Sequence, residues 1–139
     1  MGNWGQEAEG IMRERFGKDT VIALATVEDG VPYVRNVNAY YADGAFYVIT
    51  HAMSNKMRQI GESPAVAIAG DWFTGHGTGT DLGFFGREEN QAIAQTLRKA
   101  FAGWIGNGHT DLGDENTVIL RIALTDGLLL SHGTRYTLE

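Results

Sequence analysis

The chain contains no cysteine, and this absence removes several kinds of site at once. A sequence of 139 residues without thiols has no disulfide framework, no thiol nucleophile and no cysteine-ligated metal. Apolar runs of the roughly 20 residues needed to span a bilayer are missing, and no signal-peptide pattern opens the sequence. We therefore expect a cytoplasmic protein with no membrane association.

Basic residues are also few: eleven Lys and Arg stand against seventeen Asp and Glu, and the net charge at pH 7 is −6. Nucleic-acid binding depends on neutralising many phosphates, so this charge balance argues against a nucleic-acid partner. An anion site must instead be built locally from a small number of cations. The length and the hydrophobic content of 43% predict one domain, residues 1–139, with a single core.

What the chain does contain is a series of short strand-like runs separated by tight-turn signals. Asp-Gly pairs at 29–30, 43–44 and 126–127 are typical of two-residue hairpin turns, because both residue types tolerate positive φ. The runs expected to be strands are 20–27, 31–42, 45–50, 65–72, 117–125 and 128–131.

Three segments have a helical pattern, residues 4–16, 54–61 and 86–105, and the last belongs to a helical insertion at about 86–106. The glycine-rich residues 74–83 are expected to form a loop. Short strands joined largely by hairpins, with helices at the periphery, favour a mainly β fold, a six-stranded antiparallel split or closed barrel. A parallel doubly wound sheet is disfavoured, because the first three strands lack helical crossovers.

A cation in the middle of an apolar strand, Arg35, is the strongest indication of a ligand. Period-2 alternation puts Arg35 on one face with Val37 and Ala39, and a cation in apolar surroundings requires a counter-charge. Ser54 and Lys56 begin the helix that follows the next strand, where free N–H groups and the helix dipole attract anions. If the two strands pair, all three groups can converge on one phosphate. The competing interpretation is a snorkelling arginine, a plain helix cap and a solvated lysine, and the spacing does not decide between them.

The order of these motifs resembles that of a known family. Arg35-x-Val, Tyr47-x-x-Thr, Ser54-x-Lys and Ser63-Pro-Ala-Val follow one another as in the pyridoxamine 5′-phosphate oxidase-like FMN-binding split barrels, and the overall layout is similar to the short bacterial subgroup. The resemblance implies a six-stranded split barrel that forms a two-fold homodimer with cofactor sites at the interface. It also implies an FMN-dependent oxidoreductase, with hydride transfer at flavin N5 and a small-molecule substrate.

The resemblance also assigns residues to the cofactor. Arg35, Ser54 and Lys56 would hold the FMN phosphate. The further residues expected at the flavin site are Val37, Asn38, Val48, Ile49, Thr50 and Asn55. No side chain is identified as a catalytic acid or base, and no histidine spacing indicates a metal site.

Two departures from the family pattern matter. Asn55 stands where the fuller phosphate motif has arginine, so the expected cradle has one cation fewer. The final residues, 133–139, lack the Arg- and Pro-containing segment that helps the family's oxidase bind its substrate, so oxidation of pyridoxamine phosphate is not expected. The alternatives are that the barrel binds the deazaflavin F420 or haem, or that it binds a flavin without turnover, as a sensor.

Overall fold

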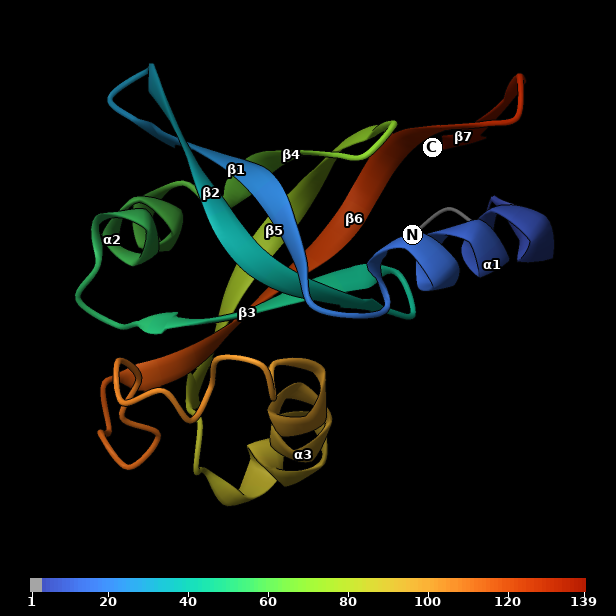
Figure 1. The fold of residues 1–139 in the computed structure, drawn as a ribbon. Coiled ribbons are helices and arrows are strands. Elements are labelled where there is room, and N and C mark those ends of the chain that lie inside the picture. The colour runs from blue at the N-terminus through green and yellow to red at the C-terminus, as the bar shows by residue number, and fades with distance from the viewer. Residues whose placement is uncertain (1–3) are drawn as a thin grey trace.

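The computed structural model of the chain describes residues 4–139 and shows a barrel of antiparallel strands with helices around it (Figure 1). Its elements are α1 (Gly5–Phe16), β1 (Thr20–Glu28), β2 (Val31–Ala42), β3 (Ala45–His51), α2 (Asn55–Glu62), β4 (Ala65–Gly70), β5 (Phe73–Phe84), the 3₁₀ turn η1 (Glu88–Asn90), α3 (Gln91–Ala100), β6 (Thr117–Ser131) and β7 (Thr134–Leu138).

The sheet runs in the order β3-β2-β1-β4-β5-β6-β7, and an additional pairing of β3 with β6 closes the first six strands into a barrel. The predicted six-stranded antiparallel barrel is thus confirmed, and β7 adds a short seventh strand alongside β6. The turns at Asp29-Gly30 and Asp43-Gly44 are also confirmed, since all four residues have positive φ. Of the helices in residues 4–139, none is long and apolar enough to cross a bilayer.

The barrel is split between β2 and β3. Among the described residues these two strands pair only over Tyr40–Ala42 and Ala45–Tyr47. Beyond that point β2 continues along β1, whereas β3 continues along β6, so the two strands diverge. Figure 1 shows α2 beside the diverging ends. The facing edges of β2 and β3 therefore present main-chain groups that are not paired with each other.

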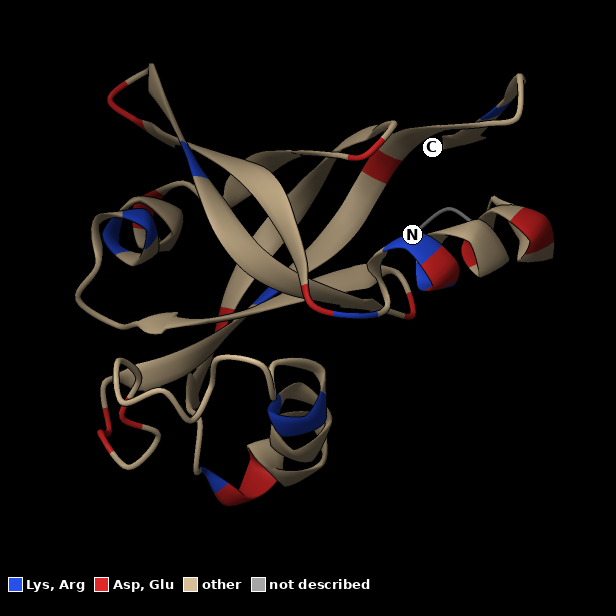
Figure 2. Ribbon diagram, in the orientation of Figure 1, with Lys and Arg blue, Asp and Glu red and all other residues tan. Residues whose placement is uncertain are grey.

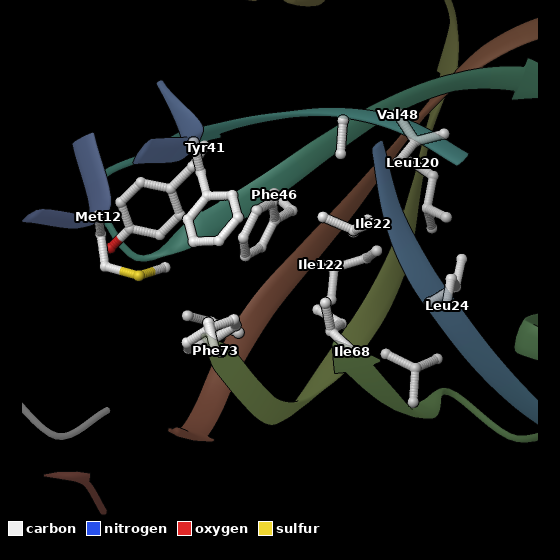
Figure 3. Close-up of a cluster of buried hydrophobic side chains, with 14 of the residues drawn as sticks. Met12, Ile22, Leu24, Tyr41, Phe46, Val48, Ile68, Phe73, Leu120 and Ile122 are labelled. Atoms are coloured by element: carbon white, nitrogen blue, oxygen red, sulfur yellow. The ribbon is translucent and has the colours of Figure 1, made fainter. Parts of the chain in front are cut away.

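Aromatic side chains fill one end of the barrel (Figure 3). Phe46 contacts Phe16 and Tyr41 at centroid separations of 5.6 and 5.2 Å, in edge-to-face geometry. Phe16 and Met12 come from α1, which closes this end of the barrel with its buried face. Burying such large rings contributes most of the core's stability, roughly 25 cal/mol per Å² of apolar area removed from water.

A second, smaller core lies outside the barrel. There α3 and the segment after it pack Leu97 and Phe101 against Ile119 of β6 and Phe85. The predicted helix 86–105 is wrong in its length, because α3 ends at Ala100 and Phe101 has φ of −99° and ψ of 19° outside the helix. Apolar spacing continues through Trp104, but that residue packs from a turn rather than from a helix.

The expectation of a loop at 74–83 is wrong, since these residues belong to the long strand β5. Gly75, Gly77 and Gly79 alternate with exposed side chains and face inward, where there is no room for a Cβ atom. A Cβ on Gly75 would lie 2.7 Å from the Asp126 carbonyl, and one on Gly77 would lie 2.7 Å from the Ala123 carbonyl. Glycine is thus required in this strand by close approach to β6 rather than by a turn.

The third predicted hairpin, at Asp126-Gly127, is also wrong. The chain runs straight through these residues in β6, and the pairing with β5 moves from Gly77↔Leu124 to His76↔Asp126. Thr125 is the extra residue of a β-bulge. The Asp-Gly pair therefore marks an irregularity within one strand.

Candidate functional site

The guanidinium of Arg35 is half-buried, and three oxygen atoms hold it in place. Nη1 donates hydrogen bonds to the main-chain oxygen of Leu24 at 3.2 Å and to Oγ1 of Thr26 at 2.8 Å. Nη2 donates to Oε1 of Gln59 at 3.0 Å. Burial lowers the pKa of Arg35, but an arginine stays protonated in proteins, so the group is a fixed cation. Because all three acceptors are neutral, its charge is oriented without being neutralised.

The two side chains that hold Arg35 are buried themselves. Thr26 is fully buried and Gln59 is 3% exposed, and the Thr26 hydroxyl donates to Oε1 of Gln59. Nε2 of Gln59 donates in turn to the carboxylate of Glu28 at 3.2 Å, which also accepts from Arg58 at 3.1 Å. These bonds from Gln59 and Arg58 lower the pKa of the Glu28 carboxyl. The carboxylate of Glu28 is thus connected to Arg35 only through Gln59, and it is already paired with Arg58.

Lys56 brings a second positive charge to Arg35. Burial, and then the charge of Arg35, lower the pKa of Lys56, as expected for two cations that share one partly desolvated corner. Within residues 4–139, neither Arg35 nor Lys56 forms an ion pair with a carboxylate. Like charges in such surroundings repel each other, and an anion bound between them would relieve the repulsion.

The start of α2 is built as the sequence predicts, with Ser54 as its N-cap. The Ser54 hydroxyl accepts a hydrogen bond from the main-chain N–H of Met57 at 3.4 Å. Asn55, the residue that replaces a cation of the family motif, accepts a bond from Nη1 of Arg58 at 2.9 Å. Figure 2 shows basic residues on α2 and on the part of β2 that lies near it. The structure therefore brings the predicted phosphate residues to one corner of the barrel.

The residues expected along the flavin lie on the two sides of the split between β2 and β3. Val37 and Val48 turn their side chains into the barrel core, and Ile49 packs in the outer core under α3. Asn38 is exposed and donates a hydrogen bond to Asp19 at 3.0 Å, while Thr50 is half-buried. The side chain of Val48 is buried, whereas that of Val37 is partly exposed.

Sequence reasoning missed the residues that position Arg35. Thr26 and Gln59 form the network around its guanidinium, yet neither stands in a recognisable motif. A signal was present in β1, where Ile22, Leu24 and Thr26 share the inward face. A threonine at the third position of an otherwise apolar, inward row needs a polar partner inside the barrel.

The fold is a split β-barrel in which two half-buried cations, Arg35 and Lys56, lie close together at one corner. The family model for pyridoxamine 5′-phosphate oxidase matches residues 9–130. The chain therefore belongs to the pyridoxamine 5′-phosphate oxidase family of split-barrel proteins. No curated protein sequence matches it.

Solved structures share the fold at low sequence identity. A FAD-binding protein from Mesorhizobium loti is 14% identical, with a TM-score of 0.68 and coverage of 93% of each chain. An F420 reductase is 19% identical, with a TM-score of 0.61 over 83% of this chain and 94% of that one. A heme-binding protein from Mycobacterium smegmatis is 16% identical, with a TM-score of 0.70 over 99% of this chain and 58% of that one. These similarities concern the fold alone.

Proposed function

We propose that the protein is an FMN-binding flavoprotein and that it works as an oxidoreductase on a small molecule. The observation that supports this most is the pair of half-buried cations, Arg35 and Lys56, which have no carboxylate counter-charge among the described residues and lie beside the split of the barrel. A phosphate fits this corner because a planar guanidinium and an ammonium both donate to its oxygens. The ring system of the cofactor would then extend from the corner along the split.

In this proposal the chain's own groups bind and orient the cofactor. Arg35, locked by Thr26 and Gln59, fixes the position of the phosphate, and Lys56 and the first N–H groups of α2 add positive potential. Main-chain groups of Val37 and Val48 would face the ring in this arrangement. When bound, FMN would supply hydride transfer at its N5 atom, while the protein supplies binding and hydrogen bonds.

The proposal includes a homodimer with cofactor sites at the interface. Apolar side chains on the outer face of β1 and β2 are exposed to solvent, among them Val21 at 57% and Val34 at 70%. A second copy of the chain would cover them, and contiguous exposed apolar residues are common at such contacts. Light scattering tests this point directly, because a monomer at micromolar concentration would exclude the shared site.

A second candidate function rests on the structural relatives, which include an F420 reductase and a heme-binding protein. F420 also carries phosphate, so the corner at Arg35 and Lys56 would suit it as well. Haem carries carboxylates in place of phosphate. A third candidate, flavin binding without turnover, leaves the site unchanged and differs only in the absence of redox activity.

The deciding experiment offers cofactors to the cofactor-free protein. The fluorescence of FMN should decrease when it binds. FMN should also raise the melting temperature of the protein, because a ligand that binds only the folded state stabilises that state. Riboflavin, which lacks the phosphate, is the matched control and should bind about tenfold more weakly or worse. F420 and haem are tested in the same way. If riboflavin binds as well as FMN, the phosphate cradle is wrong, and if only F420 or haem binds, the second candidate replaces the first.

A further inference from the structure

Trp72 is an exposed tryptophan that the backbone holds in an unfavourable conformation. It lies in the two-residue turn between β4 and β5, after Asp71, and its φ is 52°. Bulky side chains rarely adopt this left-handed region, which is mostly left to glycine and asparagine. The residue is nevertheless 70% exposed, so burial does not offset the strain. A strained residue kept at the surface indicates a role for its side chain in binding.

Arg15 of α1 fastens this turn to the neighbouring strand. Its Nη1 donates to the main-chain oxygen of Asp71 at 3.0 Å and to that of Leu130 in β6 at 3.2 Å. The main-chain N–H of Leu130 donates in turn to the Trp72 carbonyl at 3.0 Å. Both hydrogens of Nη1 are thus used, whereas Nε and Nη2 have no acceptor among residues 4–139. These two nitrogens form an edge of the guanidinium that matches a carboxylate.

A pocket of about 420 Å³ lies beside this clamp. Its described lining consists of Arg15, Trp72, Leu130, Ser131, His132 and Gly133. Leu130 is 37% exposed, so its side chain and the indole supply the apolar part of the wall. Arg15 is the one fixed charge in this lining, and it forms no ion pair with a carboxylate of the described chain. The pocket therefore offers an aromatic surface beside an oriented cation.

We infer that this pocket binds a planar aromatic carboxylate, with the ring against Trp72 and Leu130 and the carboxylate on the free edge of Arg15. An indole stacks on many kinds of ring, and the bidentate contact with arginine fixes the direction of the acid group. The guanidinium is already held by two main-chain oxygens, so little conformational entropy is lost when the acid binds. The volume suits a ligand of one or two rings.

The surroundings of Arg15 select among anions. An adjoining polar groove of about 660 Å³ is lined by three carboxylates, those of Glu7, Glu14 and Asp71, and by Lys18. These carboxylates would repel a phosphate dianion about twice as strongly as an anion with one charge at the same place. A single carboxylate on an otherwise uncharged ring is therefore the ligand that fits.

This site is separate from the proposed FMN corner and from the proposed contact between copies. Figure 1 shows α1 and α2 on opposite sides of the barrel, and Arg35 hydrogen-bonds to a residue of α2. The described lining residues of the pocket come from α1, the β4–β5 turn, β6 and the turn after β6. In the sheet, β4 and β5 lie between β6 and the strands that carry the exposed Val21 and Val34.

The experiment uses the whole protein and two probes with the same ring, 2-naphthoate and the neutral 2-naphthamide. Binding is followed by the indole N–H resonances of the three tryptophans, of which the Trp72 resonance is the one missing from Trp72→Asn. In the wild type, 2-naphthoate should bind saturably and shift the Trp72 resonance. It should bind about tenfold more tightly than 2-naphthamide, because a hydrogen bond to a charged group is worth at least that factor.

Arg15→Gln should abolish the preference for the acid over the amide, and Arg15→Lys, which keeps the charge and loses the planar fork, should retain part of it. Arg13→Gln removes an exposed arginine of the same helix and is the control, so it should keep the full preference. Trp72→Asn should weaken both probes by about tenfold. It should also raise the melting temperature, because asparagine tolerates the φ of this turn.

Equal affinity for the two probes in the wild type would overturn the inference, and so would a preference for the acid that survives Arg15→Gln. If Trp72→Asn dissociates an oligomer and leaves probe binding unchanged, Trp72 is a contact between copies and the inference is wrong. Displacement of 2-naphthoate by FMN would place the probe at the cofactor site and would also contradict it. FMN affinity should be the same in all these variants, which separates this pocket from the site at Arg35.

Discussion

Oε1 of the buried Gln59 accepts a hydrogen bond from Nη2 of Arg35 at 3.0 Å, and this contact ties the end of the barrel to α2. The same oxygen accepts from the Thr26 hydroxyl, so one amide fixes a cation from β2 and a hydroxyl from β1. A guanidinium held in this way loses little conformational entropy when it meets a phosphate. The site is thus oriented before any ligand arrives.

Replacing Gln59 with Leu should destabilise the fold and weaken FMN binding together. The Thr26 hydroxyl and Nη2 of Arg35 would lose their acceptor in a buried setting, which typically costs about 1–3 kcal/mol. Urea unfolding of the cofactor-free protein measures the first effect and fluorescence titration measures the second. Gln95→Leu, on the exposed face of α3, is the control and should change neither quantity. Full FMN affinity in the Gln59 variant would show that Arg35 does not need this positioning.

Replacing Arg35 with Ala should lower FMN affinity by about tenfold to a hundredfold, since a charged hydrogen bond to phosphate contributes about 1.5–3 kcal/mol. Arg35→Lys should recover only part of the loss, because an ammonium lacks the planar fork. Arg13→Ala removes an exposed arginine of α1 and serves as the control for net charge. Riboflavin affinity should stay unchanged in all three variants. A variant that loses both ligands equally would point to a disrupted fold instead of a lost phosphate contact.

The sequence was sufficient to predict the barrel and the corner where Arg35, Ser54 and Lys56 come together, because their signals are local. Hairpin turns at Asp29-Gly30 and Asp43-Gly44 define the first three strands, and the N-cap at Ser54 defines the start of α2. Strand alternation places Arg35 on the inward face, where the structure has it half-buried. These features depend on residues adjacent in the chain, so they can be inferred without knowing the tertiary packing.

The errors arise where tertiary contacts decide the structure. Glycine at 75, 77 and 79 looks like a flexible loop, whereas it permits close packing of β5 on β6 and on Ile60. Asp126-Gly127 looks like a turn, whereas it follows a bulge that only the pairing with β5 reveals. The neutral partners of Arg35 were not foreseen, because Gln59 lies 24 residues away along the chain. The alternation of glycine with threonine and histidine over 74–80 was a period-2 signal that favours a strand.

Gly77→Ala should destabilise the protein by about 1–3 kcal/mol, as expected for overpacking of a close-packed site. The added Cβ would lie 2.7 Å from the Ala123 carbonyl and 2.8 Å from Cγ2 of Ile122, and backbone cannot easily move away. Gly10→Ala, in the exposed middle of α1 with no atom within 4 Å of its Cβ, should instead stabilise by about 0.5–1 kcal/mol. Chemical denaturation of both variants checks the contrast. A tolerated Gly77→Ala would mean that β5 is not packed on β6 as described.

Lys56 should give stability and FMN affinity opposite dependences on pH in the alkaline range. Its pKa in the folded protein is lowered by burial and by Arg35, so between the folded and the unfolded pKa the unfolded chain binds more protons. The free energy of unfolding of the cofactor-free protein should therefore gain a rising contribution as the pH increases through this window. FMN affinity should fall over the same window, because the phosphate loses a cation as Lys56 deprotonates.

Lys56→Met should remove both pH trends and should lower the FMN affinity already at neutral pH. Lys99→Met on α3 is the control and should leave both pH trends unchanged. If FMN affinity in the wild type stays constant up to the ordinary pKa of lysine, Lys56 does not contact the phosphate.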